Sequence, residues 1–171
     1  MNAFSPLPPP PVLAAERPRD HALVEGLVAR AFGPGRFAKT AERLREGHRP
    51  DLAMSLIAWD GDRAVGCVRQ WPVRIGGTPA LLLGPFAVEE AFRKRGMGAT
   101  LIRSACGVAA RASHGLILLV GDEPFFGPLG FSRALAARVR LPGPVDQRRV
   151  MARELIPGAA ADLEGLVTVA A

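Results

Sequence analysis

The chain has 171 residues and a mass of 18.1 kDa, which predicts a single domain that folds without a metal or disulfide staple. Apolar residues make up 49% and charged residues 22%, values that exclude disorder over most of the chain. The longest apolar run, at 115–121, is far too short to span a membrane, and two cysteines exclude a disulfide framework or a cysteine-based zinc cluster.

The net charge of +6 favours encounters with anions such as phosphate groups. The basic residues are scattered, aromatic residues make up only 6% and tyrosine is absent, so we expect no nucleic-acid partner. Prolines stand near the N-terminus where a secretory signal needs basic and apolar segments, which favours a cytoplasmic location. The three histidines have no metal-ligand spacing, and no metal is expected.

Residues 1–11 contain a polyproline stretch, which cannot enter a helix or a sheet interior and which we expect to form a flexible N-terminal segment. Residues 12–171 are expected to form one domain. Its first elements are predicted as an edge strand at 12–15, a helix at 23–31 and a second amphipathic helix over 37–47.

The pattern then changes to that of an antiparallel meander. A strand is predicted over 54–59, and Asp60-Gly61 is a strong hairpin signal before a returning strand at 64–75. Gly76-Gly77 is a second turn, which leads into a strongly apolar third strand at 81–88.

The third strand begins a different kind of unit. A helix with one apolar face follows it and ends at Gly115, and 116–120 is a short apolar strand of the buried parallel type. Residues 81–120 therefore form a βαβ unit, and the expected fold class is a mixed α/β (α+β) sheet. A short helical turn and two late strands are predicted at 125–129, 136–141 and 150–156.

The connection between the third strand and the helix contains the candidate ligand-binding residues. Its sequence is Arg93-Lys94-Arg95-Gly96-Met97-Gly98-Ala99-Thr100. The first turn of a helix has backbone N–H groups without partners and a partial positive charge. Glycine allows a ligand to approach the backbone closely, and three neighbouring cations add attraction for an anion. A phosphate group is the expected occupant.

Several phosphate ligands compete for this turn. A P-loop requires Lys and then Ser or Thr after its last glycine, but Ala99 follows Gly98, which excludes it. The dinucleotide fingerprint lacks its third glycine because residue 101 is leucine, and the upstream meander argues against that fold, although Asp122 follows the next strand. A tight turn that holds only solvated arginines is the structural alternative.

The block Arg-x-x-Gly-x-Gly at 93–98, in this order of elements, resembles motif A of the GCN5-related N-acetyltransferases. Residues 83–88 resemble the fourth strand of that fold, and 121–131 resemble the end of its fifth strand with the following helix. The ending at 154–159 resembles the closing block of a bacterial branch of the family. The resemblance covers the chain from about residue 13 to near its end, and it implies a fold whose parallel fourth and fifth strands splay apart.

The resemblance also implies a co-substrate, acetyl-CoA. Its pantetheine arm would lie like an added strand along Phe86, Ala87 and Val88, and its pyrophosphate would sit on 93–100. Arg93, Lys94 and Arg95 would face the pyrophosphate or the 3′-phosphate. The acceptor implied is a primary amine of a small molecule or peptide, and a homodimer is left open.

The reaction implied is direct attack of the amine on the thioester, with a backbone N–H of the splayed strand stabilising the oxyanion. An alkyl amine has a pKa near ~10.4, so a base must remove its proton. Asp122 is the first candidate, followed by Glu123 and Glu89, and a solvated or capping carboxylate is the alternative interpretation of each. An acyl-cysteine intermediate at Cys67 or Cys106 is a remote alternative.

One position departs from the family pattern. Phe126 stands where the family usually has a tyrosine that protonates the leaving thiolate, and the chain has no tyrosine to replace it. Phe126 is not itself an acid, which gives an alternative function: a CoA-binding regulatory or scaffold protein of the same fold with little catalysis. A dinucleotide-binding module is the third hypothesis. Trp71 is a candidate for the border of an acceptor cleft.

Overall fold

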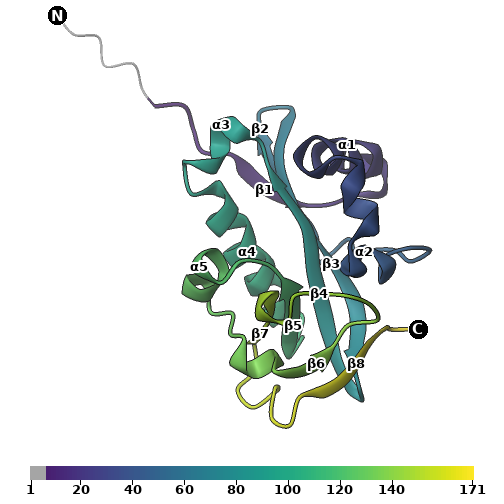
Figure 1. The fold of residues 1–171 in the computed structure, drawn as a ribbon. Coiled ribbons are helices and arrows are strands. Elements are labelled where there is room, and N and C mark those ends of the chain that lie inside the picture. The colour runs from purple at the N-terminus through teal and green to yellow at the C-terminus, as the bar shows by residue number, and fades with distance from the viewer. Residues whose placement is uncertain (1–6) are drawn as a thin grey trace, which may run out of the picture.

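Residues 7–171 are described in this computed structural model, with the side chains of Phe37 and Ala38 excepted. Most of the expected N-terminal segment, residues 1–6, lies outside the described residues, and 7–11 have no regular secondary structure. The chain forms one mixed sheet with helices on both faces (Figure 1). Across residues 7–171, no helix combines the length and apolar character needed to cross a bilayer.

The sheet follows the order β1-β2-β3-β4-β5-β7. These strands are β1 (Val12–Ala15), β2 (Leu56–Asp60), β3 (Arg63–Ile75), β4 (Thr78–Val88), β5 (Leu116–Val120) and β7 (Val150–Glu154). Every neighbouring pair is antiparallel except β4 and β5, which run parallel. The predicted edge strand, meander and βαβ unit are thereby confirmed.

A small branch leaves this sheet. β8 (Glu164–Val169) pairs antiparallel with the end of β3, and β6 (Arg138–Arg140) pairs parallel with β8. β8 was not expected from the sequence, because Glu164 and Gly165 interrupt the apolar alternation at its start. Gly165, at φ +116°, passes so close to Gly76 that a side chain would not fit.

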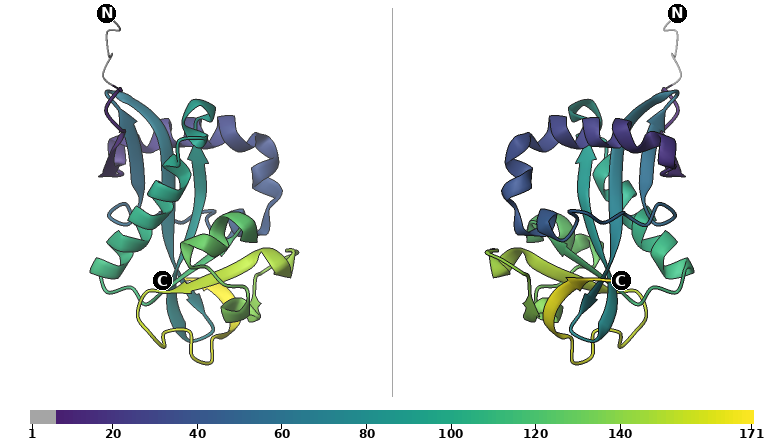
Figure 2. Two further views of the ribbon diagram at one scale, coloured as in Figure 1. Left: turned by 90° about the vertical axis from the view of Figure 1, so that its left-hand side faces the viewer. Right: turned by 90° about the vertical axis from the view of Figure 1, so that its right-hand side faces the viewer.

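The helices divide between the two faces of the sheet. α1 (His21–Phe32) and α2 (Thr40–Arg43) cover one face, whereas α3 (Glu90–Arg93), α4 (Met97–Arg111) and α5 (Glu123–Phe126) lie on the other. The two views of Figure 2 look onto these faces in turn. Short 3₁₀ turns complete the chain at Pro18–Asp20, Pro34–Ala38, Gly127–Leu129, Ala134–Ala136 and Gln147–Arg149.

Apolar packing holds each layer of helices to the sheet. α4 buries Leu101, Ile102 and Ala105 completely, and each large side chain of this kind contributes about 1.5–3 kcal/mol. On the opposite face, α1 buries one apolar stripe against β2, β3 and β4, including Ala87 of β4. The two layers of helices therefore hold β4 in place from both faces as far as its last residues, Ala87 and Val88.

The expected second helix over 37–47 is wrong. The chain makes a 3₁₀ turn at Pro34–Ala38, extends at Lys39, and forms only the four-residue helix α2. Extended backbone at Lys39 (φ −77°, ψ 138°) breaks the helical hydrogen-bond pattern between the two turns. Leu44 nevertheless faces the core, as its spacing predicts.

A buried ion pair joins β3 to α1 and to the connection between β1 and α1. Arg69 of β3 is 1% exposed, and its Nε and Nη2 donate hydrogen bonds of 3.0 and 2.6 Å to the carboxylate of Glu16. Its Nη1 donates to Glu25 Oε1 of α1 at 2.6 Å. Burial lowers the pKa of Arg69, but the two carboxylates outweigh it and raise that pKa above its ordinary value.

We predict that Glu16→Ala lowers the free energy of unfolding by about 3–5 kcal/mol, because it leaves the buried Arg69 guanidinium without its main counter-charge. Urea denaturation with an unchanged slope measures this loss. The control is Glu123→Ala, which removes a surface ion pair with Arg133 and should cost less than about 1 kcal/mol. Equal losses for the two variants would contradict the prediction.

Candidate active site

The two parallel strands of the βαβ unit separate soon after they meet. β4 pairs with β5 only at Leu81–Ile117 and Leu82–Leu118, although β4 continues to Val88. On its other side β4 remains paired with β3 up to Val88. From Leu83 onward, the edge of β4 that faces β5 is therefore open, as the resemblance implies.

A β-bulge marks the point of separation. Leu83 faces Gln70 and Phe86 faces Val68 across the β3–β4 ladder, so Gly84 and Pro85 together oppose a single residue of β3. A bulge bends its strand and increases the local twist. Trp71 Nε1 donates a 2.6 Å hydrogen bond to the Gly84 carbonyl and holds the bend in place.

The open edge offers backbone N–H groups at fixed positions. The Glu89 N–H donates a 2.8 Å hydrogen bond to the Val65 carbonyl of β3. Because N–H groups along an antiparallel strand point alternately toward and away from the partner strand, those of Phe86 and Val88 point away from β3. They face the gap between β4 and β5. A ligand amide could thus pair with β4 as an added strand.

The N-terminus of α4 adjoins the open end of β4. Gly96 precedes the helix at φ +75°, a left-handed conformation that favours glycine. The first intrahelical N–H bond belongs to Thr100, which donates to the Gly96 carbonyl at 3.0 Å. The N–H groups of Met97, Gly98 and Ala99 precede it and are available to an anion.

The expected phosphate-binding residues separate into two groups. Arg93, Gly96, Gly98 and Ala99 line one large cavity. The others lie outside its lining: Lys94, Arg95 and Thr100 are exposed to solvent, and Met97 packs into the core.

The cations also differ in their contacts. Arg93 Nε donates a 2.8 Å hydrogen bond to the Val88 carbonyl, which ties the loop to the last residue of β4. The Arg95 guanidinium lies 5.3 Å from the centre of the Phe92 ring, a cation–π contact. Of these three neighbouring cations, Arg93 is the one that lines the cavity.

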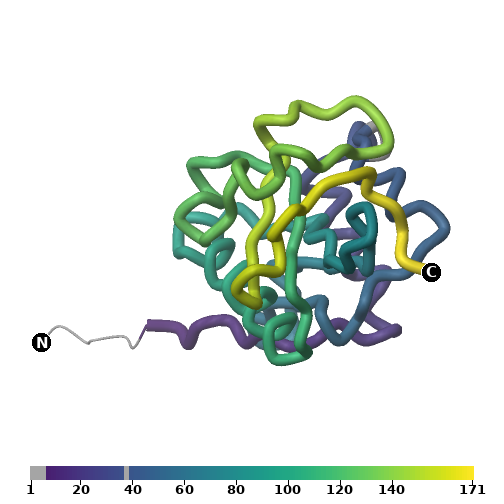
Figure 3. Tube along the Cα trace, turned by 90° about the horizontal axis from the view of Figure 1, so that it is seen from below, coloured from purple at the N-terminus to yellow at the C-terminus, as the bar shows by residue number. Residues whose placement is uncertain are grey.

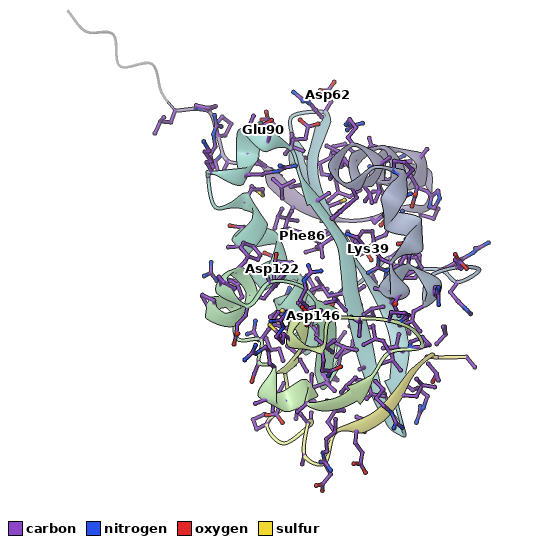
Figure 4. All side chains as sticks on the ribbon, in the orientation of Figure 1. Lys39, Asp62, Phe86, Glu90, Asp122 and Asp146 are labelled. Carbon is purple, nitrogen blue, oxygen red and sulfur yellow. The ribbon has the colours of Figure 1, made fainter. Side chains whose placement is uncertain are left out.

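This cavity has a volume of about 760 Å³ and reaches both faces of the sheet. Phe86, Ala87 and Val88 line it together with the α4 terminus on one face and with residues of α1 and α2 on the other. Phe86, Asp122, Asp146 and Lys39, which are labelled in Figure 4, come from four separate segments of the chain, and all four line the cavity. Two reactants could therefore enter from opposite faces and meet between β4 and β5.

Aromatic rings form one wall of the cavity. Phe86 and Phe125 stack with ring centres 5.8 Å apart, and Phe126 meets Phe125 edge-on at 4.8 Å. Gly98 and Gly121 make room for these rings, since a Cβ at Gly98 would lie 3.0 Å from Phe86 and one at Gly121 only 2.3 Å from Phe126. Phe126 thus supplies an apolar surface at the position where the resemblance expects a tyrosine.

Of the three carboxylates proposed as bases, only Asp122 lines the cavity. It follows β5, its side chain is 75% exposed, and its Oδ1 accepts a 3.1 Å hydrogen bond from Arg149 Nε. Glu123 pairs with Arg133, whereas Glu89 pairs with Arg63 and Arg30 away from the cavity. The geometry therefore separates Asp122 from the other two candidates.

A loop that precedes β7 also lines the cavity, and the sequence did not indicate its role. Pro144, Val145, Asp146 and Arg149 line it, although they lie far from the βαβ unit in the chain. The Pro144 carbonyl accepts a hydrogen bond from the Thr40 hydroxyl, so this loop touches α2, as Figure 3 shows from below. Hydrogen bonds from Arg148 hold the pKa of Asp146 below its usual range, which makes it a weak base.

The two cysteines lie away from this chemistry. Both thiols are buried, and neither lines the cavity. Burial raises the pKa of Cys67 to about 12 and also raises that of Cys106. Because the thiolate is the nucleophile, neither cysteine is suited to carry an acyl group at neutral pH. Among the described residues, no three His, Cys, Asp or Glu side chains gather to hold a metal.

A second cavity of about 740 Å³ lies on the face covered by α1 and α2. Trp71 lines it, together with the Arg69–Glu16–Glu25 cluster. Four residues line both cavities: Arg36, Glu42, Arg45 and Pro85. The second cavity therefore adjoins the first at the bulge of β4.

Comparison with known proteins agrees with this arrangement. The sequence model of the Acetyltransferase (GNAT) family matches residues 22–125, more than half of the chain. No curated protein matches the sequence of this chain.

Solved structures share the fold. A GNAT family N-acetyltransferase (YhbS) from Escherichia coli in complex with CoA is 23% identical, covers 99% of this chain and 94% of its own, and superimposes with a TM-score of 0.82. A GNAT family acetyltransferase from Brucella melitensis in complex with acetyl-CoA is 27% identical over 82% of this chain and 94% of its own, with a TM-score of 0.59.

Proposed function

The chain belongs to the GNAT acetyltransferase family, and on this premise we propose that it is an acetyl-CoA-dependent N-acetyltransferase that acts on a primary amine. One observation carries the proposal: the open edge of β4 and the free N-terminus of α4 line the same cavity. A ligand with an amide-containing arm and a pyrophosphate matches these two features. The CoA-bound and acetyl-CoA-bound relatives support this choice of ligand.

In this proposal, the pantetheine amides pair with the backbone of Phe86 and Val88. The pyrophosphate accepts hydrogen bonds from the N–H groups of Met97, Gly98 and Ala99, and Arg93 adds positive charge beside them. Phe86 and Phe125 provide apolar contact for the arm. The thioester then lies between β4 and β5, where the cavity opens toward α2.

The amine attacks the thioester carbonyl directly. A backbone N–H on the open edge of β4 donates to the developing oxyanion, a contact typically worth ~10²–10³ in rate. Asp122 removes the amine proton, directly or through water, because it is the proposed base that lines the cavity. The carbon–sulfur bond then breaks, and CoA leaves as a thiolate that takes its proton from water.

The alternative is a CoA-binding regulatory or scaffold protein with little catalysis. It rests on Phe126, which cannot protonate the thiolate and is buried among other aromatic rings. A thiolate with a pKa near ~8.5 leaves without acid help at a reduced rate, which favours slow catalysis over none. Release of CoA thiol across a panel of amines distinguishes the two functions.

We predict that Gly98→Asp abolishes acetyl-CoA binding and retains a cooperative unfolding transition, with the Phe86 ring shifted by a few tenths of an ångström to admit the new Cβ. The carboxylate would add negative charge and bulk at the helix turn that receives the pyrophosphate. Calorimetric titration with acetyl-CoA measures the loss. Gly107→Asp is the matched control, because it changes the same helix beside Arg111 and away from the cavity. Unchanged affinity in Gly98→Asp would refute the placement of the pyrophosphate.

Asp122→Asn should lower kcat by about 10²-fold with acetyl-CoA affinity unchanged, since it removes the proposed base but not the cofactor contacts. The thiol-release assay at several pH values gives kcat. Glu123→Gln, the adjacent carboxylate outside the cavity, should remain close to wild type. If Asp122→Asn kept its full kcat, another group or bulk water would have to be the base.

Phe126→Tyr should raise kcat by about tenfold to 10²-fold, because the added hydroxyl can protonate the leaving thiolate. Phe125→Tyr places the same hydroxyl on the neighbouring ring, which is partly exposed, and should raise kcat less. The comparison uses a saturating amine and measures acetyl-CoA affinity in parallel. A Phe126→Tyr variant no faster than wild type would show that thiolate departure does not limit turnover.

A further inference from the structure

Arg45 occupies the junction between the two cavities. It follows α2, lines both cavities and is 11% exposed in its side chain. Its Nη1 donates a 3.1 Å hydrogen bond to Glu42 Oε2, and its Nε is buried without a hydrogen-bond partner. The positive charge of this guanidinium is therefore only partly compensated, and an anion that reaches its cavity-facing side would gain affinity.

The bulge of β4 is shaped to admit this guanidinium. Gly84 adopts φ +124°, and a Cβ at that position would lie 2.7 Å from Arg45 Nη2. Gly84 precedes Phe86 by two residues, which corresponds to about 7 Å along a strand. Arg45 therefore lies close to the strand segment along which the thioester is proposed to arrive.

The charges around Arg45 suit an anion with a single negative charge. Burial, together with the nearby positive charges of Arg36 and Arg69, lowers the pKa of Arg45, and Glu42 only partly offsets these effects. A further anion beside the guanidinium would therefore be stabilised. Arg36 also lines the junction but already donates a 2.7 Å hydrogen bond to Glu25. A carboxylate pairs with a guanidinium in a planar, bidentate arrangement, and its single charge meets less repulsion from Glu42 than a doubly charged phosphate would.

We propose that the acceptor is a free amino acid whose carboxylate binds Arg45 and whose amine attacks the thioester. This inference rests on the proposed function. Because Arg45 lies against Gly84, about 7 Å along β4 from Phe86, an acceptor whose amine and carboxylate lie close together fits best, as in an α- or β-amino acid. A peptide N-terminus lacks that neighbouring carboxylate. The second cavity, at about 740 Å³, has room for the amino-acid side chain.

The first experiment compares acceptors that differ only in the carboxylate. Leucine is tested against leucinamide and isopentylamine, phenylalanine against phenylalaninamide and phenethylamine, and a leucyl dipeptide and phosphoethanolamine are added. Thiol release with acetyl-CoA should give each free amino acid a kcat/KM at least about tenfold above its amide and its decarboxylated amine. Equal or better use of the amides, the amines, the dipeptide or phosphoethanolamine overturns the inference.

The second experiment tests Arg45 itself. Arg45→Gln should lower kcat/KM for leucine by about 10- to 100-fold and change that for isopentylamine little, which reduces the ratio between them. Arg43→Gln, an exposed arginine of α2 outside both cavities, should leave the ratio unchanged. A purely structural role would lower both acceptors equally. Arg45→Lys retains the charge, and it replaces Arg45→Gln if that variant fails to fold.

The two proposals fail in different ways. Absence of acetyl-CoA binding by calorimetry would refute the proposed function. If acetyl-CoA binds, leucine is titrated into the protein loaded with CoA, and a heat of binding that Arg45→Gln weakens is expected. No binding of leucine, or binding that leucinamide matches, overturns the inference about the acceptor and leaves the acetyl-CoA site in place.

Discussion

The separation of β4 from β5 is the constraint on which the rest of the site depends. The parallel strands share only the pairs Leu81–Ile117 and Leu82–Leu118 before the bulge at Gly84 and Pro85 turns β4 aside. Buried backbone groups normally pair, so an edge that stays open inside a sheet needs a ligand or water to satisfy it. The α4 terminus adds further free N–H groups beside that edge, and the two features together define the proposed acetyl-CoA site.

The same opening connects the two faces of the sheet. α4 and the aromatic rings bound the cavity on one face, and α1, α2 and the loop that contains Pro144 bound it on the other. The second face also holds the buried charges of Arg69, Glu16 and Glu25, which fix α1 against β3. Charged groups near the bulge thus give the proposed acceptor side a polar character that contrasts with the aromatic wall on the proposed acetyl-CoA side.

The local patterns of the sequence predicted much of this molecule. The glycine turns, the apolar strand at 116–120 and the glycine-rich turn before α4 are contiguous features, and each acts through backbone geometry within a few residues. The helix expected over 37–47 is wrong because the extended conformation at Lys39 prevails over the apolar spacing. β8 was missed because its residues show no clear apolar alternation, and because its pairing with β3 joins segments far apart in the chain.

Some features of the candidate site follow from local sequence, and others depend on the tertiary structure. By itself the sequence determined the glycine turn before a helix at 93–100, the phenylalanine at 126 and the position of Asp122 after a buried strand, because these are properties of adjacent residues. Only the tertiary structure decided which proposed base lines the cavity, that Pro144 and Thr40 meet beside it, and that Arg45 lies largely buried beside the bulge. The physical reason is that burial, ion pairing and strand separation arise between segments far apart in the chain, where packing rather than local sequence determines which groups meet.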